Sequence, residues 1–336
     1  NDGSHFALFD SLVTTGSPEL QHVRQFAFKD SAKYKGRYYS DRNPGLALAT
    51  YSLYQGFKPL EGWMKPLKLD PKMARRYSEG QKSRATIVML VPSVCGSLLI
   101  LAIFTLARHL GTGFYASLLT ALAIVFGTIA FRYATLFYSH IFSATLLTWG
   151  LILLFSYRTN AKVSYLCSGT FLLSSAVLAE HLVILIFIPV FIYLLATRLH
   201  ALVRLPTLIP FLCAGLLPMM ILMAYNSTCF DSPFSIAHFH HSTDARNHQM
   251  ETLFDFDSFL KVLSNLMFGA DKVEVGRQDL TSLLNASPFL YFALGTIPLV
   301  LWRKLKPSAE HCVLLASSCL LILGAASFWA PYGGWD

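Results

Sequence analysis

Residues 163–196 read VSYLCSGTFLLSSAVLAEHLVILIFIPVFIYLLA, and this stretch decides how the chain is threaded. It is apolar along its length except where Glu180 and His181 interrupt it. One continuous helix of this length would run roughly 50 Å at ~1.5 Å per residue, whereas the hydrocarbon layer of a membrane is ~30 Å thick. We therefore expect two short, tilted crossings, with Glu180 and His181 at the turn between them.

The rest of the chain has the same apolar character. It has 336 residues, of which 54% are hydrophobic and 14% are charged, whereas a soluble domain is usually ~25% charged. This composition predicts an all-α polytopic membrane protein. The net charge of +8 is then first a signal of topology. Nothing resembles a nucleic-acid-binding module, and the six cysteines include no CxxC, which argues against a zinc site or a disulfide framework.

Eight membrane spans are expected, and they divide the chain into four regions. The spans are residues 85–107, 113–131, 137–156, 163–179, 182–197, 205–225, 287–302 and 311–330. The regions are an external loop with interfacial helices (1–84, one helix near 46–56), a bundle of about six spans (85–225), an external loop (226–286), and two further spans with a tail (287–336). Because both ends of the sequence are polar and abrupt, we also expect a fragment that lacks a preceding span.

Basic residues indicate which face each connection occupies. They cluster in alternate connections only if residues 163–197 form a hairpin, and the positive-inside rule then places them in the cytoplasm. These residues are Arg108, His109, Arg158, Lys162, Arg198, Arg204, Arg303, Lys304 and Lys306. The remaining connections share the opposite face. The basic run 72–84 is an exception, which either crosses despite its charge or binds anionic lipid or phosphate.

Most of the unusual polar residues fall on that opposite face. Asp2 is either a general base or part of an ordinary Asp-Gly turn. His140 either binds a metal or phosphate or caps a helix, and Glu180 is either functional or paired with Arg132. Since the span interiors hold little charge, the sequence favours a site at one membrane face over a site at mid-membrane.

Two further segments carry chemistry-bearing residues. GRYYSDRNPGL (36–46) places Asp41 and Arg42 before a stiff corner made by Pro44 and Gly45, which is either a site or an exposed connection. SPFSIAHFHHSTDARNH (232–248) holds four histidines that suggest metal ligands, although their spacing fits no standard site. They are His238, His240, His241 and His248.

Taken in order, these motifs resemble bacterial polytopic glycosyltransferases of the GT-C superfamily, near the protein O-mannosyltransferases and the lipid A aminoarabinose transferases. The resemblance runs through NDGSHFAL, GRYYSDRNPGLAL, ATLFYSH, LAEHLVIL, NSTCFDSPFSIAHF and PYGGWD. The chain departs from the family pattern at four positions. Arg42 and Asn43 replace a Lys-Pro pair, His181 replaces a common Tyr, and Asp231 replaces a Gly.

The resemblance implies a GT-C-like bundle and an enzyme of the EC 2.4 type. It would transfer a sugar from a polyprenyl-phosphate donor to a glycan, lipid or protein acceptor by an inverting displacement. It also implies an integral protein of the bacterial inner membrane whose site faces the periplasm, with membrane lipids around it. The lipid tail of the donor would lie in a groove among the spans, and the loop 226–286 would cover the site.

The resemblance also implies roles for individual residues. Asp2 is the expected catalytic base, and Arg42 and Arg132 are expected to bind the donor phosphate. His140 and Glu180 are expected to hold a divalent cation (Mg or Mn) or to orient the base. Substrate contacts are expected from Tyr38, Tyr39, Asp41 and His181, with the two tyrosines stacking on the sugar.

Two rival functions stay open on sequence grounds. A transporter or flippase for lipid-linked sugars would need charge deep in the spans, and only Glu180 is a candidate. A catalytically inactive membrane scaffold would explain the departures at Asn43, His181 and Asp231.

Overall fold

The computed structural model describes residues 2–27, 30–59, 78–240, 259–268 and 308–327, and this part of the chain is mostly helical. Four of its helices are long and apolar enough to cross a membrane: Gly80–His109, Ser139–Asn160, His181–Leu202 and Leu205–Phe230. Shorter apolar helices cover Phe114–Phe126, Val163–Ala179 and Ala309–Ala325. The prediction of a helical polytopic membrane protein is therefore confirmed.

The bundle helices follow the predicted spans closely between residues 79 and 230. They are α5 (Glu79–His109), α6 (Phe114–Phe126), α7 (Ala130–Tyr133), α8 (Ser139–Asn160), α9 (Val163–Ala179), the 3₁₀ helix η2 (His181–Ile186), α10 (Phe187–Leu202) and α11 (Leu205–Phe230). Later elements are η3 (Ala237–His240), α13 (Phe259–Phe268) and α17 (Ala309–Ser327). The span predicted at 287–302 lies outside the described residues.

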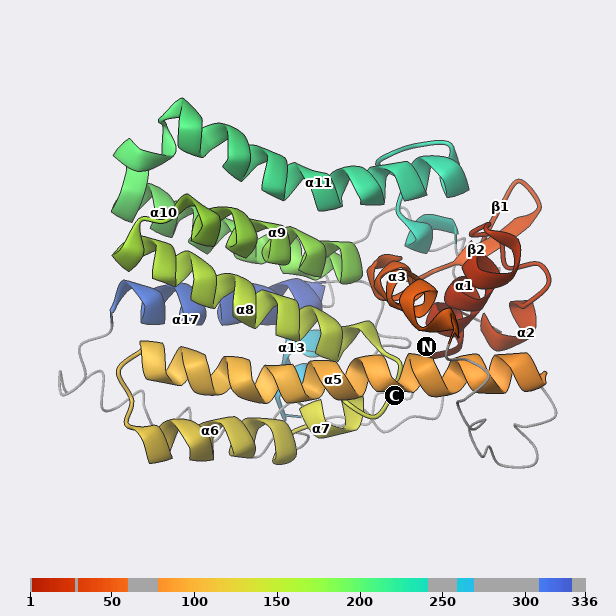
Figure 1. The fold of residues 1–336 in the computed structure, drawn as a ribbon, viewed down its shortest axis with the longest axis horizontal. Helices are drawn as coiled ribbons and strands as arrows, with labels where there is room; N and C mark the ends of the chain where they lie inside the picture. Colours follow the sequence, from red (N-terminus) through yellow and green to blue (C-terminus); the bar gives the residue numbers. More distant parts are fainter. Residues whose placement is uncertain (1, 28–29, 60–77, 241–258, 269–307, 328–336) are drawn as a thin grey trace.

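The hairpin predicted for residues 163–197 is present. Helix α9 ends at Ala179, and Glu180 then takes an extended conformation (φ −145°, ψ 113°) before η2 and α10 return along the bundle. The polar pair therefore interrupts the apolar stretch where the chain reverses. Because α9 and α10 run in opposite directions, the basic connections near residues 108, 158 and 198 lie together at one end of the bundle (Figure 1).

The N-terminal region, which was predicted to be an external loop, is more structured than the sequence predicted. It contains α1 (Asp2–Thr15), α2 (Arg24–Ala27), β1 (Ser31–Tyr34), β2 (Arg37–Ser40) and α3 (Gly45–Phe57). Helix α3 matches the helix expected near 46–56. The β1–β2 hairpin was not expected, and its two-residue turn explains it: Lys35 (φ 47°) and Gly36 (φ 82°) both have the positive φ that such tight hairpin turns require.

Helix α5 begins before the span predicted at residue 85, because a capping box fixes its start. The Ser78 side chain accepts from the backbone N–H of Gln81, and the Gln81 side chain accepts from the backbone N–H of Ser78. The first turns then meet α1, where Arg84 contacts the fully buried Asp10 at 2.7 Å. Arg84 is thus an internal ion-pair partner, so this member of the basic run 72–84 is not free for a lipid head group.

The helices pack closely where two glycines face each other. A Cβ on Gly150 of α8 would stand 3.0 Å from the carbonyl oxygen of Gly169, and a Cβ on Gly169 of α9 would stand 2.9 Å from that of Gly150. Small residues allow this backbone approach, which is typical of helix pairs in membranes.

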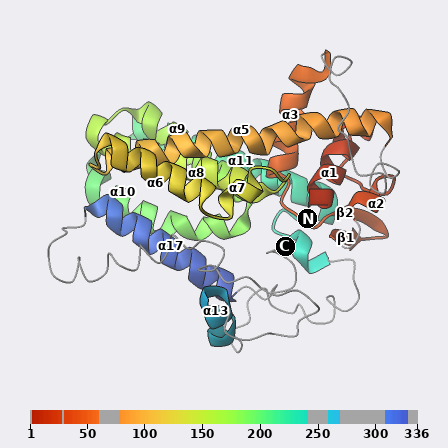
Figure 2. The ribbon, with the colours of Figure 1, turned by 90° about the horizontal axis from the view of Figure 1, so that it is seen from below.

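All the elements of this N-terminal region gather at one end of the bundle. Figures 1 and 2 show α1, α2, α3 and the β1–β2 hairpin beside the first turns of α5, away from the basic connections at the other end. Their buried apolar side chains form one core with α5, α7 and the start of α8. This shared apolar core holds the polar residues of these elements in fixed positions against the bundle.

Candidate functional site

The corner at residues 40–45 is held from two sides. On one side, Ser4 of α1 lies 2.8 Å from the Ser40 hydroxyl and donates to Asp41 Oδ1 at 3.2 Å. On the other side, the Asn43 side-chain amide donates to the carbonyl oxygen of Val177 in α9 at 3.1 Å. Asp41 is 2% exposed. The corner is therefore a buried contact between the N-terminal region and the bundle, and the alternative of an ordinary exposed connection is wrong.

Glu180 and His140 form the most direct contact among the predicted site residues. His140 Nδ1 lies 2.9 Å from Glu180 Oε1, and the Ser139 hydroxyl donates to the same carboxylate. Burial alone would raise the pKa of Glu180, but the charge and hydrogen bond of His140, together with Ser139, hold that pKa well below its usual range. Glu180 is therefore an anion paired with His140, and the alternative pairing with Arg132 is not observed.

Arg42 joins the same cluster from the corner. Its Nε lies 3.5 Å from Asp41 Oδ1 and its Nη2 lies 3.7 Å from Asp30 Oδ1. Burial alone would lower the pKa of Arg42, but the negative charges of Asp41, Asp30 and Glu180 outweigh it, so the pKa is raised. Its side chain is 23% exposed, so one part of this fixed cation faces the surface.

His5 is a member of the cluster that the sequence analysis missed. It lies in the second turn of α1, is 1% exposed, and meets the Phe137 ring edge-on at 6.2 Å between centroids. Burial and, after it, the charge of the nearby Arg42 lower the pKa of His5 to about 3, so the imidazole is neutral at ordinary pH. A histidine in an apolar helix pattern gives no separate sequence signal, which is why only the fold reveals it.

The two tyrosines predicted to stack on a sugar have other partners. Tyr39 is 5% exposed and packs against Phe230 at 5.6 Å between ring centroids, so its ring belongs to the core, and its contact with a sugar stays a prediction. Tyr38 lies on the other face of the strand, where the Arg24 guanidinium covers one side of its ring at 3.6 Å. The strand alternation that places one ring inside turns the next ring outward.

Arg132 is not brought to the cluster. It lies on the short helix α7 with an exposed side chain, and within the described ranges no ion pair joins it to an acid. Asp2 is the first residue of α1, so its backbone is helical and the Asp-Gly turn is not formed. The Asp2 side chain lies outside the described residues, and its role as a base stays a prediction.

His181 and the loop histidines are spread over two places. The His181 ring meets His238 of η3 edge-on at 6.1 Å, next to Glu180. His240 instead stacks on Phe230 at 4.8 Å and contacts the Ser235 hydroxyl at 2.8 Å. His241 and His248 lie outside the described residues.

The described residues do not form a recognisable metal site. In the described part of the chain, no group of three or more His, Cys, Asp or Glu side chains is arranged to hold a metal ion. His140 and Glu180, which were expected to hold a divalent cation, are bonded to each other. Among the described residues the pair is thus an internal contact, and both the cation and the orienting role stay predictions.

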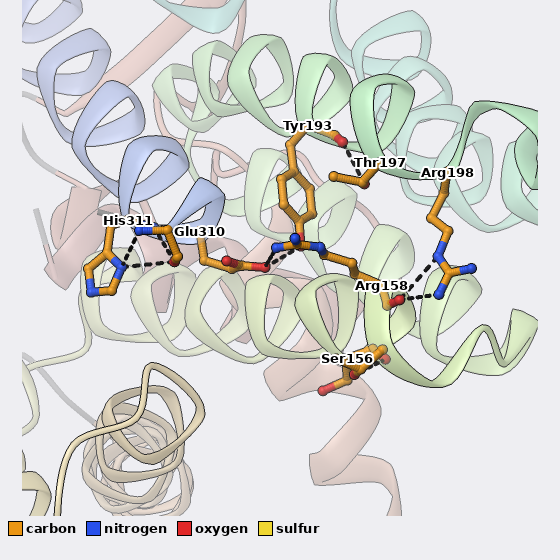
Figure 3. Close-up of polar contacts among 9 residues, drawn as sticks. Ser156, Arg158, Tyr193, Thr197, Arg198, Glu310 and His311 are labelled. Carbon is orange, nitrogen blue, oxygen red and sulfur yellow. Dashed lines mark hydrogen bonds and ion pairs between the residues drawn. The ribbon is translucent and has the colours of Figure 1, made fainter. Parts of the chain in front are cut away.

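A second polar cluster lies at the opposite end of the bundle (Figure 3). Glu310 of α17 receives Arg158 Nη1 at 2.5 Å and the Tyr193 hydroxyl at 2.9 Å, while Arg198 donates to the Arg158 carbonyl oxygen. These contacts join α8, α10 and α17. Each of these four side chains has a protein partner, so the cluster is a structural clamp between the three helices.

Comparisons with known proteins give similarity at the level of solved structures alone. No protein-family model and no curated protein sequence matches the chain. Among solved structures, the chain is similar to the apo form of the Archaeoglobus fulgidus oligosaccharyltransferase, with 15% identity and a TM-score of 0.48. The match covers 99% of this chain and 36% of that one, so the present chain spans about a third of that protein's length. The function is accordingly argued from the chain's own residues.

Proposed function

We propose that this chain is a membrane glycosyltransferase that moves a sugar from a polyprenyl-phosphate donor to an acceptor at the non-cytoplasmic face of a bacterial inner membrane. One observation carries the proposal. Residues from four separate parts of the sequence meet at one end of an apolar bundle: His5, the corner Asp41–Arg42, His140 and Glu180. A polar cluster of this kind at a membrane face suits a substrate with a polar head and a long apolar tail.

Transfer of the sugar requires a base for the acceptor and a positive charge for the leaving phosphate. The acceptor hydroxyl loses a proton as it attacks the anomeric carbon, and one carboxylate opposite the leaving group suffices for inversion. Asp2, at the start of α1 and one turn before His5, is our proposed base. The bond from the anomeric carbon to the phosphate oxygen breaks, and charge develops on the departing polyprenyl phosphate, where a cation stabilises it.

Arg42 is the proposed cation for that phosphate. Its guanidinium is planar and permanently charged, which suits bidentate binding of a phosphate. Asp41 and Asp30 hold it in place, but the cluster then contains three carboxylates against Arg42 and His140. We expect the donor phosphate to compete with Asp30 for the exposed side of Arg42. A divalent cation stays an expectation of the family resemblance, and no step is assigned to it.

The position of Glu180 disfavours the carrier alternative. It lies at the end of α9, where the chain reverses, and not in the middle of a span. A carrier more often binds its substrate near the midplane of the bilayer. An inactive scaffold is excluded only by measuring the reaction.

The test is a transfer assay with the full chain in lipid nanodiscs and undecaprenyl-phosphate-linked hexoses and pentoses as donors, with release of undecaprenyl phosphate as the readout. Asp2→Asn should lower kcat by about 100-fold or more while the protein stays folded. Arg42→Ala should chiefly raise KM for the donor, and the exposed Arg132→Ala serves as its comparison, since a similar rise there would extend the phosphate site to α7. Absence of turnover with every donor, or full turnover by Asp2→Asn, would contradict the proposal.

A further inference from the structure

One ring nitrogen of His5 makes no hydrogen bond to the part of the chain that the structure describes. Its Nδ1 is buried and has no hydrogen-bond partner among the described residues. Buried polar atoms are paired in the great majority of cases, because leaving one unpaired costs free energy of folding. An unpaired nitrogen in the middle of a charged cluster is therefore a cost that calls for a reason.

The surroundings of His5 resemble a binding site more than a core. Three charged or ionisable side chains act electrostatically on its ring: Arg42, Glu180 and His140. Their side chains are 23%, 30% and 40% exposed, whereas His5 is 1% exposed. The cluster thus has a solvent-exposed (wet) side, formed by Arg42, Glu180 and His140. Its inner side, formed by His5 and Phe137, is buried (dry).

A neutral imidazole suits one class of ligand group. It carries one donor and one acceptor nitrogen, so it can pair with a hydroxyl, which itself both donates and accepts. A phosphate would instead be drawn to the cation at Arg42. The two residues therefore divide the polar head of a glycosyl phosphate between them, with the hydroxyls on the dry side.

We propose that His5 Nδ1 is a sugar-hydroxyl contact, which the substrate fills when it displaces the side chains that cover the ring. This inference rests on the proposed function and adds to it a residue that selects the sugar. It explains why an unpaired polar atom is kept in a position where an apolar ring would pack at lower cost. It predicts opposite effects on stability and on activity, which a purely structural histidine would not show.

The experiment compares three variants of the full chain in nanodiscs with the wild type. His5→Phe keeps a ring without the nitrogen, His5→Leu is a smaller apolar alternative in case Phe does not fit, and His5→Asn restores a polar atom near the Nδ1 position. The exposed His22, which contacts Thr14 Oγ1 at 3.1 Å, supplies the control His22→Asn. Each protein is measured for Tm and for kcat and KM with the undecaprenyl-phosphate-linked sugar that the wild type uses best.

The expected result is a Tm that rises by a few degrees in His5→Phe or His5→Leu while kcat/KM falls by about 10- to 100-fold. His5→Asn should recover part of kcat/KM, and His22→Asn should match the wild type. Turnover within threefold of wild type in the apolar variants, or a loss of Tm in step with activity in both, would overturn the inference. The outcome is separate from that of the proposed function, which fails if the wild type itself transfers no sugar or if Asp2→Asn keeps full turnover.

Discussion

Gly45, the first residue of α3, lies against Ala179, the last residue of α9. An ideal Cβ on Gly45 would stand 2.7 Å from the backbone nitrogen of Ala179 and equally close to the carbonyl group of Leu178. Real Cβ atoms do not approach backbone this closely, so only glycine allows the contact. Since Glu180 follows directly, this contact fixes the distance between the Asp41–Arg42 corner and the Glu180–His140 pair.

We expect Gly45→Ala to push α3 away from the end of α9. The change should cost about 1–3 kcal/mol of unfolding free energy, as overpacking usually does, and it should lower transfer even where the protein is still folded. Gly56→Ala is the matched control in the same helix, because nothing lies within 4 Å of its Cβ position. That control should be neutral or stabilising by up to about 1 kcal/mol. Equal behaviour of the two variants would show that the contact with Ala179 is unimportant.

The pair His140–Glu180 is expected to matter more for activity than for stability. Both side chains are partly exposed, so a double-mutant cycle with His140→Gln and Glu180→Gln should give a coupling of only about 0.5–1 kcal/mol in unfolding free energy. Transfer, in contrast, should fall at least tenfold in either single variant if the pair orients the reacting groups. Glu19→Gln, which removes a surface partner of Arg37 at 3.8 Å, should change neither quantity.

The clamp formed by Glu310, Arg158 and Tyr193 at the other end of the bundle should matter more for stability than for activity. Glu310→Gln leaves Arg158 without its charged partner, and we expect it to cost about 1–3 kcal/mol of unfolding free energy. Tyr193→Phe removes one hydrogen bond to the same carboxylate and should cost about 0.5–1.5 kcal/mol. Below the melting temperature, kcat/KM should be unchanged in both. A specific loss of transfer at unchanged Tm would instead make this cluster part of the functional site.

His5 makes the stability of the fold depend on pH. The folded protein keeps this ring neutral down to a pKa of about 3, whereas an unfolded histidine binds a proton below ~6.5. The unfolded state therefore binds more protons in this interval, and stability falls as pH drops from ~6.5 towards 3. Glu180, whose folded pKa is lowered from 4.5, adds its own loss only as pH falls below that value.

The window between pH 5 and 6.5 isolates the histidine contribution from that of Glu180. Unfolding free energy measured there should fall less steeply with decreasing pH in His5→Asn than in the wild type, by up to one proton in the linkage slope. Identical slopes would mean that His5 takes up a proton in the folded protein as readily as in the unfolded chain.

The sequence predicted what depends on hydrophobic pattern. The reversal at Glu180, the bundle helices between residues 79 and 230 and the helix after Pro44 all follow from apolar runs and their interruptions. The capping box at Ser78 and Gln81 was also readable, and it would have set the start of α5 correctly.

Contacts between distant residues were beyond reach of the sequence alone. Arg84 looked like one of a run of surface cations, but its partner Asp10 lies 74 positions away. Tyr39 looked like a substrate contact until the hairpin turned it towards Phe230. The Lys35-Gly36 turn was a weak signal for a hairpin, because lysine does not favour a positive φ.

The hydrogen bond from Asn43 to Val177 spans 134 positions of the chain, and this has a consequence for biosynthesis. The Asp41–Arg42 corner leaves the ribosome long before α9, so during translation it has α1 on one side but lacks its partner on the other. Its charged side chains must stay hydrated until α5, α6, α8 and α9 have been inserted. A nascent chain that stops short of residue 180 would therefore be an inert intermediate, and proteolytic protection of the corner should appear in a single step once that length has been passed.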